Sequence, residues 1–193
     1  ELKTQEPDNA LLRELYQKME FNSLLRELGG SEPPPLERDY HQLASVDELN
    51  AWLPKQGPVA VAVGEMMSET VVGLAIREGE AKSIVLDSIP QRATVAHDIK
   101  ALVRRFGECP DLVHDVMLYG FLLSADPSAC DLASLSGRYL GRPAGSDPAA
   151  RADAALGLFQ KLRPEVEAAG LADLYARIDL PRDGVPDRAP ILS

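Results

Sequence analysis

An apolar run near the middle of the chain, PVAVAV at residues 58–63, places the strongest constraint on the fold. The run is short, rich in β-branched residues and apolar at every position. Such a pattern is typical of a strand that is buried on both faces near the centre of a sheet. Further strands are predicted at 70–76 and 82–86, and an edge strand at 40–44. Helical patterns follow these strands, so the sequence predicts a mixed α/β domain built on one sheet.

The helices are predicted from apolar spacing and capping residues. Ser45 is the expected N-cap of a short helix that ends near residue 53, with Glu48 placed to complete a capping box. From Thr94 onward the pattern is helical, with helices expected at 98–106, 116–124, 131–140, 148–162 and 164–176. Two earlier helices are predicted at 9–19 and 20–28. The prolines at 33–35 then favour an extended spacer, and the tail at 181–193 is expected to be a loop.

Composition narrows the function classes. The 193 residues include 30 Asp plus Glu and 20 Lys plus Arg, which gives a formal net charge of -10. This acidic balance disfavours a fragment that binds nucleic acid by itself. Without a long apolar segment or a leader-like start, the chain is expected to be cytoplasmic. Cys109 and Cys130 fit a reducing compartment, and no disulfide is expected. Because the first residue is Glu1 and not Met, we expect that the chain was cut from a longer protein.

Three separated segments carry a family pattern in order and spacing. They are LLRELYQKMEFNSLLREL at 11–28, PVAVAVGE with ETVVGLAI at 58–65 and 69–76, and a stretch running from HDIKALVRRFG at 97–107 to AARADAALGLFQKL at 149–162. Together they resemble bacterial DNA polymerase I in the region of its 3′–5′ proofreading exonuclease domain. The resemblance covers the chain to about residue 181, and RDGVPDRAPILS then departs from the family.

The resemblance implies a ribonuclease H-like fold and a division into three parts. Residues 1–38 would be a helical linker from the 5′ nuclease region, 39–180 a degenerate exonuclease domain, and 181–193 a linker or disordered tail. The parent protein would be a DNA-directed DNA polymerase of replication and repair, associated with the bacterial nucleoid. Implied contacts are packing on the polymerase domain and DNA reached through the full-length protein, with no membrane contact and a monomeric state. Mg²⁺ is expected for the parent's polymerase domain, and no cofactor for these residues.

In this family, acidic side chains hold a pair of divalent cations that activate water, and hard cations require such oxygen ligands. The first family motif reads Asp, any residue, Glu on a strand. The matching triplet here is Val63, Gly64, Glu65, so an apolar residue replaces the Asp while the Glu remains. A lone Glu65 cannot hold two metal ions.

The other two motifs also lack their acidic ligands. With Asp98 at the family's Asn position, the metal-binding Asp falls on Leu102. A shift of one or two residues changes nothing, because no acidic residue lies between Ile99 and Gly107. In the third motif, Asp147 stands at the Tyr position and Arg151 at the ligand Asp. Arg151 would place a permanent positive charge where a cation should sit.

Several polar residues have ordinary structural interpretations. Glu65 is expected to be a solvated residue at a strand end, Asp98 and Asp115 to be helix N-caps, and Asp153 to face solvent. The basic residues Lys100, Arg104 and Arg105 are interpreted as a solvated helix face. His41, His97 and His114 lack zinc-site spacing and are interpreted as structural.

The sequence therefore predicts a vestigial exonuclease fold, without activity of its own, that supports the polymerase domain. No catalytic or metal-binding residue is expected, with Glu65 the residual metal candidate. Two alternatives remain open. The fragment would be a divergent but active exonuclease of the ribonuclease D type, or a free-standing interaction module whose reading frame ends near Ser193.

Overall fold

The computed structural model describes residues 38–177 except 67, 108 and 110, and additionally Leu12, Leu15 and Tyr16. The chain divides into two compact units, Glu1–Glu37 and Arg38–Ser193, and the account below concerns the second. The helices predicted at 9–19 and 20–28 lie outside the described residues apart from those three positions. The proline spacer and the tail at 181–193 also lie outside them. No helix in the described part of the chain has the length and apolar character needed to cross a membrane.

A mixed sheet of six strands organises the second unit, in the order β1-β4-β3-β2-β5-β6. The strands are β1 (Asp39–Gln42), β2 (Ala60–Met66), β3 (Glu69–Arg77), β4 (Glu80–Val85), β5 (Val95–Ala96) and β6 (His114–Asp115). Strands β2, β3 and β4 form an antiparallel meander, whereas β1 pairs with β4, and β5 with β2 and β6, in parallel. The predicted central strand is β2, and the predicted edge strand is β1.

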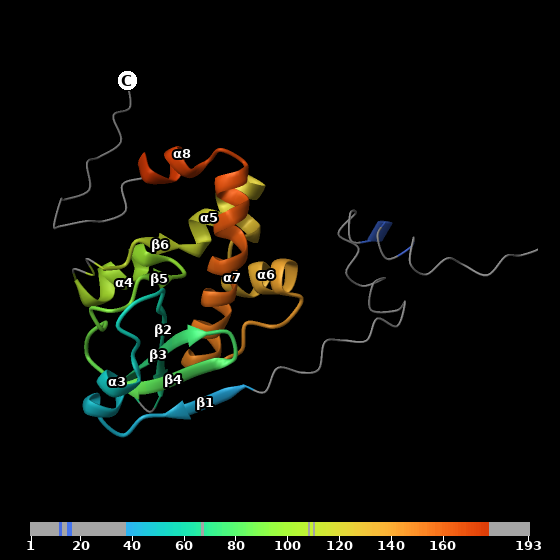
Figure 1. Ribbon diagram of the computed structural model, residues 1–193. Helices are drawn as coiled ribbons and strands as arrows, with labels where there is room; N and C mark the ends of the chain where they lie inside the picture. Colours follow the sequence, from blue (N-terminus) through green and yellow to red (C-terminus); the bar gives the residue numbers. More distant parts are fainter. Residues whose placement is uncertain are drawn as a thin grey trace, which may run out of the picture. The chain divides into compact units, whose positions relative to one another are not determined.

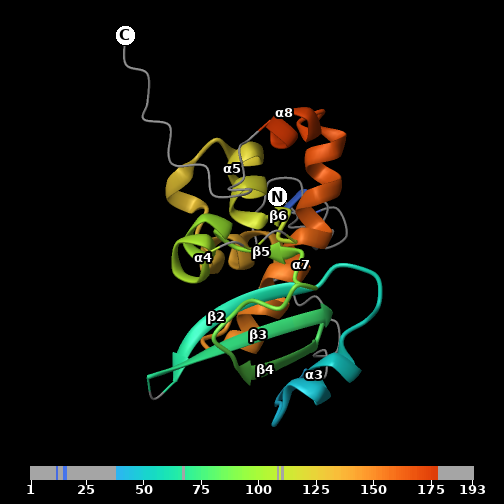
Figure 2. The same ribbon diagram turned by 90° about the vertical axis from the view of Figure 1, so that its left-hand side faces the viewer.

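Helices cover both faces of this sheet (Figures 1 and 2). On one face, Ala60 and Ala62 of β2 join the cluster built around α7 (Pro148–Ala168). On the other face, Val59 and Val61 join the cluster that includes Leu49 of α3 (Val46–Trp52) and residues of α4 (Ile99–Phe106). Alternate side chains of one strand thus enter two different cores, which explains why the run is apolar throughout. The expected α/β class and ribonuclease H-like arrangement are confirmed.

Most predicted helices form close to their expected positions. Ser45 caps α3 by accepting from the Glu48 amide at 3.3 Å, and the Glu48 carboxylate accepts from the Ala44 amide at 3.0 Å. Helix α5 (Val116–Ser124) matches its predicted bounds. The segment expected to be one helix at 131–140 is instead α6 (Leu132–Leu135) followed by the π-helical turn η2 (Ser136–Leu140), after a short 3₁₀ turn η1 (Pro127–Ala129).

Two expectations in the C-terminal half are wrong. Pro164 does not end a helix, because α7 continues through it to Ala168, and the break comes at Gly170 (φ 71°) before α8 (Ala172–Arg177). The chain from Thr94 onward is also not wholly helical, since β5 and β6 add two parallel strands there. Each has only two residues, which is too short to produce a periodic pattern.

Two glycines allow the start of α7 to approach the sheet closely. A Cβ added to Gly64 of β2 would lie 2.9 Å from Cγ of Pro148, and one added to Gly73 of β3 would overlap the Pro148 carbonyl group. Pro148 itself is buried. The notch formed by Gly64 and Gly73 therefore fixes the position of the first turn of α7, which carries Arg151.

A buried aromatic cluster joins β6, α5, α7 and α8. The His114 ring lies 4.7 Å from that of Phe159, and its Nδ1 is 2.9 Å from the Tyr119 hydroxyl. Tyr119 in turn lies 4.5 Å from the ring of Tyr175. The hydroxyl of Tyr175 accepts from the Asp115 amide and donates to the Val113 carbonyl, which fixes α8 against β6. His114 thus has the structural role expected for it.

The stability of the domain is expected to depend on the charge of His114. Burial, with a contribution from Arg163, lowers the pKa of His114 below its ordinary value of 6.5, so folding favours the neutral ring. The unfolded state then binds the proton more readily, and stability present above pH 6.5 should be lost as the pH falls toward the folded-state pKa. Urea unfolding at several pH values should show a smaller loss for His114→Gln than for the unsubstituted chain. Equal losses in both proteins would contradict this role for His114.

Candidate functional site

Val63 and Glu65, which the resemblance matches to the family's first motif, lie where β2 extends beyond the end of β5. β5 pairs with β2 only at Ala60 and Val61, whereas β3 pairs with β2 as far as Met66. Among the described residues, no strand therefore covers the other edge of β2 from 62 onward. Val63 and Glu65 lie on this uncovered stretch. Ligands of open α/β sheets bind at such a place, outside the carboxyl ends of the strands.

Val63 is half-buried and contacts both neighbouring layers. Its side chain packs against the cluster that contains Leu102. Its backbone carbonyl accepts a hydrogen bond from Nη1 of Arg151 at 3.1 Å. The first and third family positions, 88 residues apart, are therefore in direct contact.

Leu102, which the resemblance matches to the family's second motif, lies on α4, and α4 packs on the face of the sheet opposite to α7. Leu102 is 9% exposed and belongs to the core beneath Val59 and Val61. Asp98 caps α4 by accepting from the Ala101 amide at 3.0 Å, with its own φ at 59°, a left-handed conformation that Asp tolerates better than most residues. The predicted capping role of Asp98 is confirmed, and Leu102 serves as a core residue.

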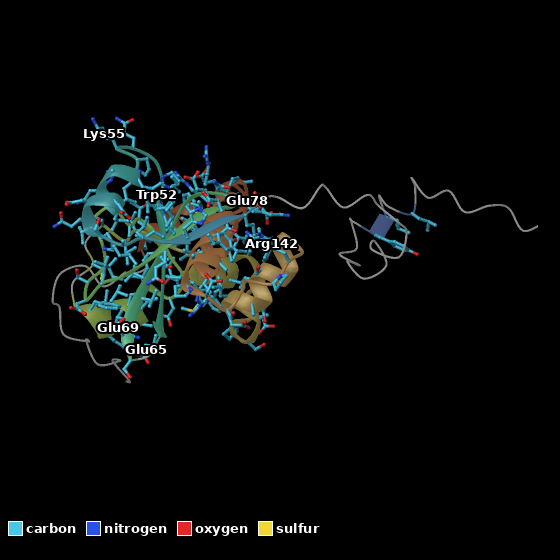
Figure 3. The ribbon with its side chains drawn as sticks, turned by 90° about the horizontal axis from the view of Figure 1, so that it is seen from below. Trp52, Lys55, Glu65, Glu69, Glu78 and Arg142 are labelled. Carbon is cyan, nitrogen blue, oxygen red and sulfur yellow. The ribbon has the colours of Figure 1, made fainter. Side chains whose placement is uncertain are left out.

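Glu65 is exposed at the end of the β2–β3 hairpin, near Glu69 (Figure 3). Its Oε1 accepts from Nη2 of Arg105 at 2.8 Å, and the same nitrogen donates to the Thr70 hydroxyl at 3.1 Å. The Glu65 and Arg105 side chains are 67% and 39% exposed, so solvent screens the pair and its contribution to stability is small. The prediction of a solvated strand-end Glu is confirmed. Arg105 was interpreted only as part of a solvated helix face, so its ion pair with Glu65 was not predicted.

The third family motif lies in the first turn of α7. Asp147 is exposed and caps the helix by accepting from the Ala150 amide at 3.0 Å. Arg151, one turn further, is half-buried and reaches Val63. The structure thus brings Arg151 into contact with Val63, whereas Leu102 shares the apolar cluster against which Val63 packs, and Glu65 is bound by Arg105 of α4.

The expectation that Asp153 faces solvent is wrong. Asp153 is fully buried. Its carboxylate accepts from the Tyr40 hydroxyl at 2.6 Å, the Gly79 amide at 2.8 Å and Nη2 of Arg142 at 2.9 Å. The residues from Ala152 to Phe159 are all buried, because this part of α7 lies between the sheet and helices α5 and α6. No polar side of the helix exists there for Asp153 to occupy.

This buried network was not predicted. Tyr40 and Arg142 reach Asp153 from β1 and from the loop before α7, and burial followed by the Asp153 hydrogen bond raises the pKa of Tyr40. Figure 3 shows Arg142 near Glu78, at the end of the sheet opposite to Glu65. Tyr40 and Asp153 are 113 residues apart, and no local sequence signal links them.

Asp115 is the N-cap of α5, as predicted, and it also accepts hydrogen bonds at the start of α4, which was not predicted. Its carboxylate accepts from the Met117 amide of α5, and from the amides of Asp98 and Ile99 at the start of α4. The residue is 2% exposed, and this burial raises the pKa of the carboxyl despite the opposing effect of the three amides. Asp115 therefore couples the start of α4, which carries Leu102, to β6 and α5.

The residues at the end of β2 do not fit a pair of divalent cations. A guanidinium is held at the Val63 carbonyl, a leucine lies in the core, and the remaining carboxylate is bound by Arg105. Hard cations require several oxygen ligands, and a fixed positive charge repels them. Across the described parts of the chain, no group of three or more His, Cys, Asp or Glu could hold a metal ion. Cys109 and Cys130 are both buried and free, as expected.

Comparison with known proteins gives a match at the level of structure. No protein-family description and no curated protein matches the sequence. Among solved structures, the chain is similar to one described as the POL domain of Pol1 from M. smegmatis in complex with DNA primer-template and dNTP, with a TM-score of 0.59 and 19% identity. The two share a fold. The match covers 72% of this chain and 29% of the other, so this chain spans less than a third of its structural neighbour.

Proposed function

We propose that this chain is a fragment of a DNA polymerase I-related protein, and that its exonuclease-like domain is a catalytically inactive structural support for a polymerase domain. The likeness of fold to part of a Pol1 chain supports the relationship. The order and spacing of the three sequence segments support it independently. The protein's contact with DNA would then be made through the polymerase domain.

One observation carries the proposal of inactivity. The Arg151 guanidinium donates to the carbonyl of Val63, the residue that the resemblance matches to the family's first metal ligand, and this cationic neighbour supports the proposal. Removing carboxylates from such a site removes both the metal ligands and the electrostatic stabilisation of the transition state. Glu65, bound to Arg105, does not replace them.

The purified chain is therefore expected to leave a 5′-labelled single-stranded oligonucleotide intact in Mg²⁺ or Mn²⁺. Glu65→Ala should give the same trace as the unsubstituted chain on a denaturing gel. Progressive shortening that Glu65→Ala abolishes would establish the alternative, an active exonuclease of divergent type. Shortening that persists in Glu65→Ala would indicate a contaminating nuclease, and further purification should then remove it.

Reversing the substitutions tests whether the family positions converge. The double variant Val63→Asp/Arg151→Asp places three carboxylates, with Glu65, around the end of β2. It should bind Mn²⁺, measured by the loss of the free-ion electron paramagnetic resonance signal, whereas the unsubstituted chain should not. Arg163→Asp, on an exposed part of the same helix, is the control for replacing an arginine of α7 by a carboxylate. If the double variant, shown to be folded by circular dichroism, binds no more Mn²⁺ than this control, the positions do not form one site.

The polymerase relationship has a separate test. The native reading frame is expected to continue from these residues into a polymerase region. A frame that ends near Ser193 would instead support a free-standing interaction module.

A further inference from the structure

Helix α5 has no charged side. Asp115 and Asp126 flank it, and no charged residue lies between them. A helix that is apolar all round is normally buried on every side. Phe121 is nevertheless 41% exposed, and Met117, on the same helix, is only half-buried. Part of α5 therefore lacks the apolar neighbour that a helix of this composition usually has.

The exposed side of α5 faces away from α7. The Tyr119 ring lies 6.4 Å from that of Phe159 in α7 and 4.5 Å from that of Tyr175 in α8. Phe121 lies two residues after Tyr119, which is about 200° around the helix. Met117 lies one turn before Phe121 and shares its side. The side that carries Met117 and Phe121 is thus not the one that packs on α7.

Burying this side of α5 would cost little in lost hydrogen bonds. Ser124, one turn after Phe121, donates its hydroxyl to the Gly120 carbonyl at 2.8 Å. A polar group that is already bonded within the protein loses less than an unbonded one when water is excluded. The neighbouring helix α8 adds Leu174, which is 50% exposed. We call Met117, Phe121 and Leu174 the α5–α8 surface.

The other large apolar side chains that are exposed among the described residues of this unit have polar neighbours. They are Val46, which is 50% exposed, and Val85, which is 41% exposed. Val46 is followed by Asp47 and Glu48, and Val85 is close in sequence to Asp87. Figures 1 and 2 show α3 and β4 at one end of the domain and α5 and α8 at the other. Isolated apolar residues of this kind are common on protein surfaces, so Val46 and Val85 need no partner.

The described part of the domain also ends at the α5–α8 surface. Helix α8 is its last element and ends at Arg177. The Tyr175 hydroxyl fixes α8 by accepting from the Asp115 amide and donating to the Val113 carbonyl. Residues 178–193 follow α8 in the sequence. A domain joined after them would be tethered beside α5, and a tether raises the local concentration of a partner at nearby surfaces.

From this arrangement we propose that α5 and α8 form the docking surface for the polymerase domain, with Phe121 and Leu174 as its main apolar contacts. The inference rests on the proposed function and adds the place of contact to it. The structural neighbour is long enough to contain such a further domain, since the match covers 29% of its chain. Phe and Met are among the residues enriched at the centres of protein interfaces.

The test compares the 193-residue chain with the protein extended along its native reading frame through the polymerase region. A single cysteine replaces Phe121, Leu174, Val46 or Val85, and its rate of reaction with a maleimide reagent is measured in both proteins. Phe121→Cys and Leu174→Cys should react several-fold more slowly in the extended protein, because docking excludes the reagent. Val46→Cys and Val85→Cys, which match them in exposure, should react at the same rate in both proteins.

The native cysteines do not obscure this measurement. Cys109 and Cys130 are buried, and the unsubstituted proteins give their background rate. A second measurement needs no added cysteine. Leu174→Ser should lower the urea midpoint of this domain more in the extended protein than in the 193-residue chain, because only the extended protein loses a docking contact. Val46→Ser, the control, should have equal effects in the two proteins.

The outcomes separate this inference from the proposed function. If the reading frame continues into a polymerase region but positions 121 and 174 react equally in both proteins, the docking surface is wrong and the relationship stands. Slower reaction at 46 and 85 would place the contact at α3 and β4 and also overturn the inference. Protection that grows with the concentration of the 193-residue chain would identify a second copy as the occupant instead. A frame that ends near Ser193 would overturn the proposed function and this inference together.

Discussion

Replacing Asp153 with alanine is expected to lower the free energy of unfolding by about 3–5 kcal/mol. The substitution leaves the Arg142 guanidinium, which is 14% exposed, without its buried counterion. It also leaves the Tyr40 hydroxyl and the Gly79 amide without their acceptor. Each such group loses water on folding and gains nothing in return. Urea unfolding followed by circular dichroism measures the change.

A matched control is available on the same helix. Glu167→Ala breaks the Arg163–Glu167 pair, whose side chains are 49% and 54% exposed. That loss should be no more than about 1 kcal/mol, because water screens the pair. The paired variant Asp153→Leu/Arg142→Met removes both buried charges and should recover part of the stability lost in Asp153→Ala. Similar losses for Asp153→Ala and Glu167→Ala would show that the buried network does not stabilise the fold.

Replacing Gly73 with alanine is expected to cost about 3 kcal/mol, the upper end of the usual range for overpacked cores. The added methyl group would meet the carbonyl group of Pro148, which is backbone and cannot rotate away as a side chain would. The start of α7 must then move from the sheet, and Arg151 with it. The bond from Arg151 to Val63 should weaken in consequence.

Gly137→Ala is the control for this substitution. An added Cβ there meets no heavy atom within 4 Å, and the residue is exposed. Its effect should be neutral or stabilising by about 0.5–1 kcal/mol, since alanine restricts the unfolded chain more than glycine. If Gly73→Ala is as stable as Gly137→Ala, the contact between Gly73 and Pro148 does not position α7.

Much of the fold follows from local pattern. The apolar run at 58–63 predicted a central strand. The structure contains this strand as β2, and both of its faces pack against a core. Ser45, Asp98 and Asp115 predicted helix starts that the structure contains. Such features depend on neighbouring residues, whose spacing the sequence shows directly. Local pattern failed at Pro164, where packing of α7 between the sheet and α5 outweighs the lost backbone hydrogen bond.

The sequence alone determined the α/β class, and it supplied the resemblance that matches Val63, Leu102 and Arg151 to carboxylate positions of the polymerase family. Only the tertiary structure decided what those residues do. It placed Arg151 on the Val63 carbonyl, Arg105 on Glu65, and the predicted solvent-facing Asp153 in a fully buried network. These contacts join residues 88, 40 and 113 positions apart. Periodicity and capping report only on neighbours within a few residues, so chain packing alone can create such pairs.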